Sequence, residues 1–343
     1  MVIDPKRETV TLRHVGGVSA AQLGTLLEDA RVKPGSDADS LLARAEKLAG
    51  EGNQEEAARL YASALESAPK TWNRFARAAE ALVVALSLAG KDEDCAVRAH
   101  ALYRRLTGTA AGANIAATGL GCATDLEGGH PRRQEIIDAL EEASRTALHD
   151  PALDISDDDR SGIYIALISA REAAKDAEGE SRLERAWAAF LEGAAAKAVT
   201  PAQRTVYDSH RLSAYLELGT PEKAIPMLEQ SARDFPDDYN PHSRMALAYR
   251  AMKDYDEALA SSARALSMAY GPRKIGFFRT RADVYADMGD RESARKTIEE
   301  ALRYARSLPK EQVRAATITG LEKKLADLGA PVSSPPPPPS QRR

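Results

Sequence analysis

The sequence has few cysteines, few aromatic residues and no long apolar run. Aromatic residues make up only 5% of its 343 residues, and there are two cysteines. No apolar run reaches the length of about 18 residues that suggests a membrane-spanning helix. The N-terminus lacks the basic, apolar and small-residue regions of a secretory signal. These absences lead us to expect a cytoplasmic protein.

The two cysteines, Cys95 and Cys122, lie far apart in the sequence, and neither belongs to a CxxC pair. Both fall in apolar segments that we expect to be helical, where free thiols are commonly buried. The sequence therefore predicts two buried free thiols, and it supports neither a disulfide framework nor a zinc site.

The six histidines form no HxxxH or HExxH pair, so the spacing of a helical metal site is missing. Gly119 and Gly121 do not follow an expected strand and lack the third glycine of a phosphate-binding loop. There is no GxSxG motif, and the carboxylates are spread at helical spacing as on a solvated face. We expect no cofactor, no metal and no enzymatic activity.

What the chain does contain is alanine, charge and apolar residues. The composition is 43% apolar and 29% charged, which is sufficient for a core of closely packed helices. The net charge of −4 provides no general attraction to nucleic acid or to an anionic membrane. The expected fold class is therefore all-α, and neither nucleic acid nor a membrane is an expected partner.

An internal repeat of about 34 residues is the clearest signal in the sequence. Three segments each place an alanine nine residues after a tyrosine and a small residue seven further on. These landmarks are Tyr215, Ala224 and Ser231; Tyr249, Ala258 and Ala265; and Tyr285, Ala294 and Ala301. Gly219 and Gly289 mark the expected turns, where the middle segment has Lys253.

This pattern resembles the tetratricopeptide repeat, a helix–turn–helix unit whose copies stack because each leaves an apolar face for the next. The resemblance implies an α-solenoid of helix pairs. An earlier copy at Ala38–Thr71 carries the landmarks Ala45, Gly52, Ala57, Tyr61, Ala64 and Pro69. Pro226 lies inside an expected second helix, so we expect a kink or a late start there.

The resemblance divides the chain into several parts. We expect a β-β-α segment at 1–30, a linker at 31–37 and the first helix pairs at 38–106. Degenerate repeats follow at 107–204, with helices near 111–125, 131–148, 156–176 and 180–198. Three clear repeats at 205–309 precede a capping helix at 310–329 and a disordered proline-rich tail at 330–343.

Partners of this repeat family usually bind the concave surface lined by the first helix of each unit. The family positions that point there fall on Ser209, Ser213, Glu217, Ser243, Arg250, Arg279, Asp283 and Asp287. The Lys/Asn set with which some members hold a C-terminal carboxylate is missing. We therefore expect a protein or peptide partner on this surface, but not one that is recognised by its C-terminal carboxylate.

The first 30 residues resemble the C-terminal end of a thioredoxin-like domain. The matching pattern is a strand at Met1–Asp4, a turn, a strand at Thr9–Val15, Gly16–Gly17 and a helix from Ser19. The family's CxxC and cis-proline are absent, so its redox residues map to no position of this chain.

Two functions remain open at this point. The first is a non-enzymatic scaffold for protein interactions. The alternative is the repeat portion of a thioredoxin-like thiol-disulfide oxidoreductase whose active-site half is missing from this chain. Pro335–Pro339 favours extended polyproline II, so the tail could also be bound by a reader of proline motifs.

Overall fold

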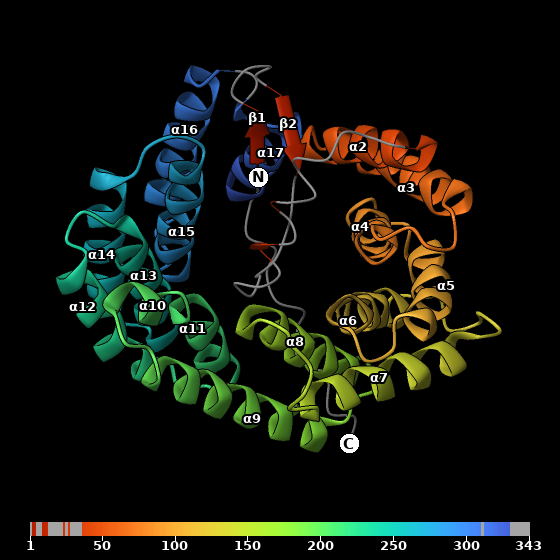
Figure 1. Cartoon of the computed structure of the whole chain (residues 1–343). Helices are drawn as coiled ribbons and strands as arrows, with labels where there is room; N and C mark the ends of the chain where they lie inside the picture. Colours follow the sequence, from red (N-terminus) through yellow and green to blue (C-terminus); the bar gives the residue numbers. More distant parts are fainter. Residues whose placement is uncertain are drawn as a thin grey trace, which may run out of the picture. The chain divides into compact units, whose positions relative to one another are not determined.

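The structure, a computed structural model, describes residues 2–4, 9–12, 23, 24, 27, 36–309 and 312–329. These residues are helical except for one small sheet and the connecting segments (Figure 1). The chain divides into two compact units, Met1–Phe190 and Leu191–Arg343, and each is described by itself.

The first unit begins with a two-stranded antiparallel sheet made of β1 (Val2–Asp4) and β2 (Thr9–Leu12). Ile3 pairs with Val10 and Asp4 with Thr9. Strand β2 contacts the first long helix, so the hairpin packs against the helical repeats. A two-stranded hairpin needs such packing, because it is only marginally stable alone in water. Strands β1 and β2 fall within the two ranges expected to be strands, while residues 1 and 13–15 of those ranges lie outside the described residues. Much of the helix expected after them, together with Gly16–Gly17, lies outside the described residues.

The long helices of the first unit form antiparallel pairs. They are α2 (Asp37–Gly50), α3 (Gln54–Ser67), α4 (Phe75–Leu88), α5 (Asp92–Leu102), α6 (Ala110–Thr124), α7 (Arg133–His149), α8 (Asp157–Ala173) and the greater part of α9 (Ala177–Ala196), whose last residues belong to the second unit. The short η1 (Tyr103–Arg105) follows α5. Each helix from α2 to α7 packs on the next, while α4 also contacts α6 and α6 also contacts α8. The first helices of successive pairs therefore lie side by side. The four helices expected between residues 111 and 198 are confirmed.

Small side chains let these helices approach closely. Ala45, Ala57 and Ala64 of the first pair are fully buried, as their positions in the repeat predict. Gly119 of α6 faces α5 so closely that an added Cβ would lie 2.2 Å from the Cβ of Ala99. The core of this unit is consequently built from alanine contacts between helices, with larger side chains such as Leu82 filling the remaining space.

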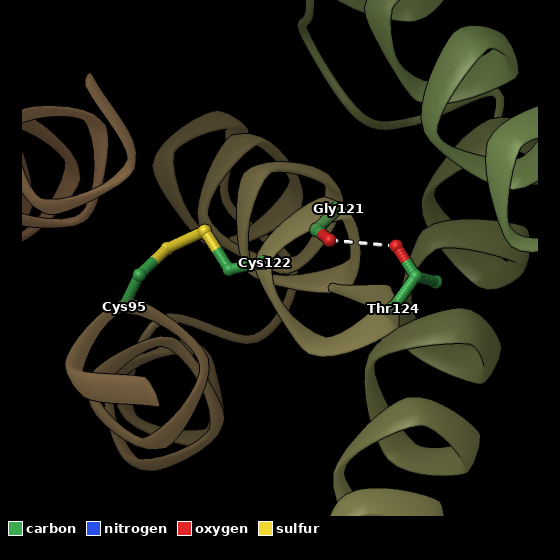
Figure 2. Close-up of a disulfide and its surroundings, with 4 residues drawn as sticks. All are labelled: Cys95, Gly121, Cys122 and Thr124. Atoms are coloured by element: carbon green, nitrogen blue, oxygen red, sulfur yellow. Dashed lines mark hydrogen bonds between the residues drawn. A yellow bond between two sulfur atoms is a disulfide. The ribbon is translucent and has the colours of Figure 1, made fainter. Parts of the chain in front are cut away.

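The expectation of two free thiols is wrong. Cys95 of α5 and Cys122 of α6 form a disulfide in the interior of the first unit (Figure 2). Their Cα atoms lie 6.0 Å apart, within the range that a disulfide can bridge. The bond covalently joins two helices that are already in contact, because α5 and α6 are neighbours in the stack.

The second unit is also built from packed helices. Its elements are α10 (Pro201–Thr205), α11 (Asp208–Glu217), η2 (Pro221–Lys223), α12 (Ala224–Asp234), α13 (Tyr239–Met252), α14 (Tyr255–Met268), α15 (Arg273–Asp287), α16 (Arg291–Ser307) and α17 (Ala315–Gly329). Helix α13 contacts both α11 and α15, and α17 packs on α16. We call α11, α13, α15 and α17 the first-helix row, because each begins a pair or occupies that place at the end of the stack.

The turns inside the repeats need a left-handed backbone. Gly219 and Gly289 have φ values of 65° and 83°, and Lys253 adopts 62° at the equivalent place. Lys253 thus has the backbone conformation that glycine has in the other two repeats. Glycine adopts this conformation without strain, whereas a residue with a side chain is strained in it.

Two sequence expectations concern where helices begin. The second helix of the Pro226 repeat starts late, because the 3₁₀ segment η2 precedes α12 and Pro226 falls in the first turn of α12. There the missing N–H costs little. The capping helix begins at Ala315 rather than at residue 310. None of the helices in the described part of the chain combines the length and apolarity needed to cross a bilayer.

Candidate partner-binding face

The predicted partner residues occupy three neighbouring helices of the first-helix row. Ser209, Ser213 and Glu217 lie on α11, Ser243 and Arg250 on α13, and Arg279, Asp283 and Asp287 on α15. Each first helix alternates buried small residues, such as Ala246 and Ala282, with polar residues that stay partly exposed. This alternation follows from the helical period, which turns one stripe toward the second helices and another away from them.

Three of the predicted residues are held together by ion pairs. The Arg250 Nε atom donates to Asp287 Oδ2 at 2.6 Å, and its Nη2 atom donates to Asp287 Oδ1 at 3.3 Å. The same guanidinium lies 3.5 Å from Asp283 Oδ2. The hydrogen bond to Asp287, opposed by partial burial, raises the pKa of Arg250 above its usual value. Arg250 therefore links α13 to α15 through two carboxylates.

A fourth member of this network was missed by the sequence analysis. Lys324 of α17 donates to Asp283 Oδ1, which extends the chain of opposite charges to a third first helix. The segment around Lys324 carries no tyrosine landmark, so the repeat pattern could not show which face of the capping helix it occupies. We call Arg250, Asp283, Asp287 and Lys324 the charged strip.

The charged strip is ordered but accessible. The exposed fractions of its side chains are 31% for Arg250, 29% for Asp283, 38% for Asp287 and 26% for Lys324. Ion pairs this exposed contribute up to about 1 kcal/mol each to stability, because water competes for both partners. Their main consequence is geometric, since they fix the direction of four charged side chains.

The remaining predicted residues are not brought into this network. Arg279 and Glu217 are exposed, and in the described part of the chain neither forms an ion pair. Ser213 donates its hydroxyl to the carbonyl oxygen of Ser209, a bond within α11. Ser243 is half-buried on α13. Arg279 and Glu217 are therefore the charged positions that a partner could engage without first breaking an internal pair.

The first helices of the other unit carry a comparable row of polar contacts. Arg77 of α4 pairs with Glu46 of α2, and Asn114 of α6 donates to Glu80 of α4 at 2.8 Å. Burial raises the pKa of Glu80 to about 7, and the charge of Asp159 adds to this, while the hydrogen bond from Asn114 opposes it. Glu80 consequently changes charge near neutral pH.

The raised pKa makes the first unit less stable as the pH increases. The folded state binds the Glu80 proton more tightly than the unfolded state, so the contribution is complete below pH 4.5 and is lost as the pH rises through about 7. Glu80→Gln keeps an acceptor for Asn114 but cannot ionise. We expect its free energy of unfolding to match the wild type near pH 4.5 and to exceed it by up to about 3 kcal/mol at pH 8.

Urea unfolding at several pH values measures this difference. Glu142→Gln, at an exposed glutamate of α7, is the matched control and should leave the pH dependence unchanged. Parallel pH profiles of Glu80→Gln and the wild type would contradict the assignment.

The arrangement offers no obvious place for a metal ion. Within the described ranges, no three histidine, cysteine or carboxylate side chains gather closely enough to bind one. The side chains of the charged strip can instead form ion pairs with charged groups of another molecule.

Comparison with known proteins identifies the repeat. The model of the tetratricopeptide repeat matches residues 241–271, which include most of α13 and all of α14, and residues 280–308, which include the second half of α15 and all of α16. The described part of the chain thus has a helical-repeat fold, and two stretches of its second unit match the tetratricopeptide repeat. The repeat predicted at 205–238 is not part of the match. No curated protein sequence matches the chain.

Several solved structures are similar to the chain. A tetratricopeptide repeat protein from Parabacteroides merdae has 11% identity and a TM-score of 0.49, covering 84% of this chain and 98% of its own. A thermophilic repeat protein of Thermus thermophilus has 15% identity and a TM-score of 0.30, with coverage of 85% and 98%. The TPR2AB domain of yeast Sti1, in a complex with pHSP90, has 14% identity and a TM-score of 0.33, with coverage of 87% and 100%.

Proposed function

We propose that this protein is a non-enzymatic scaffold that binds a protein or peptide partner along the first-helix row of its second unit. The charged strip is the observation that carries the proposal. It crosses α13, α15 and α17, and it holds side chains of both signs in fixed positions at a partly exposed surface. A fixed array of charges favours a partner with the complementary order of charges and rejects others.

The positions beside the strip support the same function. Arg279 lies one helical turn before Asp283 on α15, and its charge is free of ion pairs within the described residues. A partner carboxylate could pair with Arg279 at little cost, because no internal bond has to be broken. The net charge of −4 favours a protein partner over nucleic acid.

Reversing the charge of Arg279 tests the proposal. Arg279→Glu should reduce the affinity for a partner isolated from the native cells by about tenfold, because one favourable charge contact becomes a repulsive one. Affinity is measured by titration of the purified partner. Folding should be unaffected, since Arg279 is exposed.

Arg303→Glu is the matched control. Arg303 is also exposed but lies on α16, a second helix, where the proposed surface does not extend. Loss of affinity in both variants, or in neither, would contradict binding along the first-helix row.

A further inference from the structure

Three aromatic side chains gather where α13 and α15 begin. Tyr239 is the first residue of α13, Phe277 lies early in α15, and Tyr270 sits in the segment between α14 and α15. The ring centroid of Tyr239 is 5.4 Å from that of Phe277 and 6.2 Å from that of Tyr270. Tyr270 is 77% exposed. We call these three residues the aromatic corner.

The aromatic corner has the chemistry that recognises a polyproline segment. Prolyl rings pack on aromatic faces. The backbone carbonyl oxygens of a polyproline II strand accept no hydrogen bond from the strand itself, so they can accept one from a neighbouring donor. Tyrosine hydroxyls supply such donors. Within the described part of the chain, neither Tyr239 nor Tyr270 uses its hydroxyl in a hydrogen bond to protein, so both are available to donate.

The chain itself contains such a segment. Pro335–Pro339 is followed closely by Arg342 and Arg343. An exposed carboxylate, Asp237, lies two residues before Tyr239 at the aromatic corner. The sequence of the tail, with prolines first and cations after them, therefore complements a surface on which aromatic rings lie next to an acid.

The tail is long enough to reach this surface. Arg291 donates to the carbonyl oxygens of Asp327 and Leu328, which places the end of α17 next to the start of α16. From there to Phe277 is about 21 Å along the α15 axis. From Leu328, Pro335 and Pro339 lie 7 and 11 residues further on, which in polyproline II conformation is about 22 and 34 Å. These lengths allow the return along α15 and the sideways step between neighbouring helices.

From these observations we propose that the proline-rich tail folds back and binds the aromatic corner of its own chain. The tether raises the effective concentration of the tail to the millimolar range, so even a weak contact is occupied. This interaction is separate from the partner proposed for the first-helix row, and its test does not depend on that partner.

The experiment uses the full chain and a fluorescent peptide of residues 330–343. In one variant, each residue of Pro335–Pro339 is replaced by serine, which leaves the aromatic corner unoccupied. We expect the peptide to bind this variant at least about tenfold more tightly than the wild type, whose own tail competes. Adding Tyr270→Ser to the variant should weaken binding by about tenfold, because one of the three aromatic contacts with the prolyl rings is lost. Fluorescence anisotropy measures both affinities.

Two controls make the result specific. A peptide with serines in place of the five prolines should not bind. Val199→Ser removes another exposed apolar side chain of the second unit, 85% exposed, and should leave peptide binding unchanged. Equal affinity for the wild type and the serine variant, an absence of binding, or no effect of Tyr270→Ser would overturn the proposal. Self-association of the wild-type chain through its tail, detected by sedimentation, would overturn binding within one chain.

Discussion

Replacing Cys95 and Cys122 together with alanine is expected to lower the free energy of unfolding of the first unit by about 3–4 kcal/mol. The disulfide closes a loop with a sequence separation of 27, and opening it returns that loop entropy to the unfolded chain. Both cysteines are buried, and their replacement also removes the covalent link between α5 and α6. Urea unfolding, followed by circular dichroism, measures the loss.

Reduction provides the control for this prediction. Because the bond is buried, the wild type must be reduced while unfolded and then refolded under reducing conditions. Its stability should then approach that of the double variant, and the same treatment should leave the double variant unchanged. Equal stability of the oxidised and reduced wild type would show that the bond contributes nothing. Unfolding of the second unit should be the same throughout, because it contains neither cysteine.

Gly119→Ala is expected to destabilise the first unit by about 2–3 kcal/mol. The added Cβ would meet the Cβ of Ala99 at 2.2 Å and a methyl group of Leu140 at 3.1 Å, so α5 and α6 would have to separate. Alanine is the better helix former, and this offsets only part of the cost. The free energy of unfolding in urea measures the net effect.

Gly121→Ala, on the same helix, is the matched control. A Cβ at Gly121 would meet nothing within 4 Å, and the hydroxyl of Thr124 donates to the backbone carbonyl of Gly121, which alanine keeps (Figure 2). The gain in helix propensity should stabilise this variant by about 0.5–1 kcal/mol. Similar effects of the two substitutions would mean that the close contact at Gly119 is not what limits the helix packing.

The sequence was sufficient to predict the helix pairs but not the contacts between them. Buried Ala57 and Ala64 could be recognised from their spacing, because the repeat fixes which helix face is covered. The Cys95–Cys122 bond could not be recognised from the sequence, because its formation depends on how α5 is rotated against α6. The glycine that permits their close approach was considered only as part of a phosphate-binding motif.

The candidate site shows the same division. Arg250, Asp283 and Asp287 were predicted as partner residues from their repeat positions, yet their mutual pairing depends on the distance between α13 and α15. Glu80 looked like one surface carboxylate among many, and its raised pKa follows from burial against α6. The ion pairs of Arg250 and the pKa of Glu80 both depend on packing between helices that are far apart in the sequence. Local sequence patterns contain no information on that packing. The boundaries proposed between repeats, and the partner itself, stay predictions.

The weakly buried end of the second unit has a consequence for its dynamics. In α17 only Leu321 is fully buried, whereas α16 buries six residues. Local unfolding should therefore begin at α17, and its amide hydrogens should exchange with solvent sooner than those of α13 to α16. Every such opening separates Lys324 from Asp283 and leaves that carboxylate paired with Arg250 alone. The negative charge available on the first-helix row thus fluctuates with the fraying of the last helix.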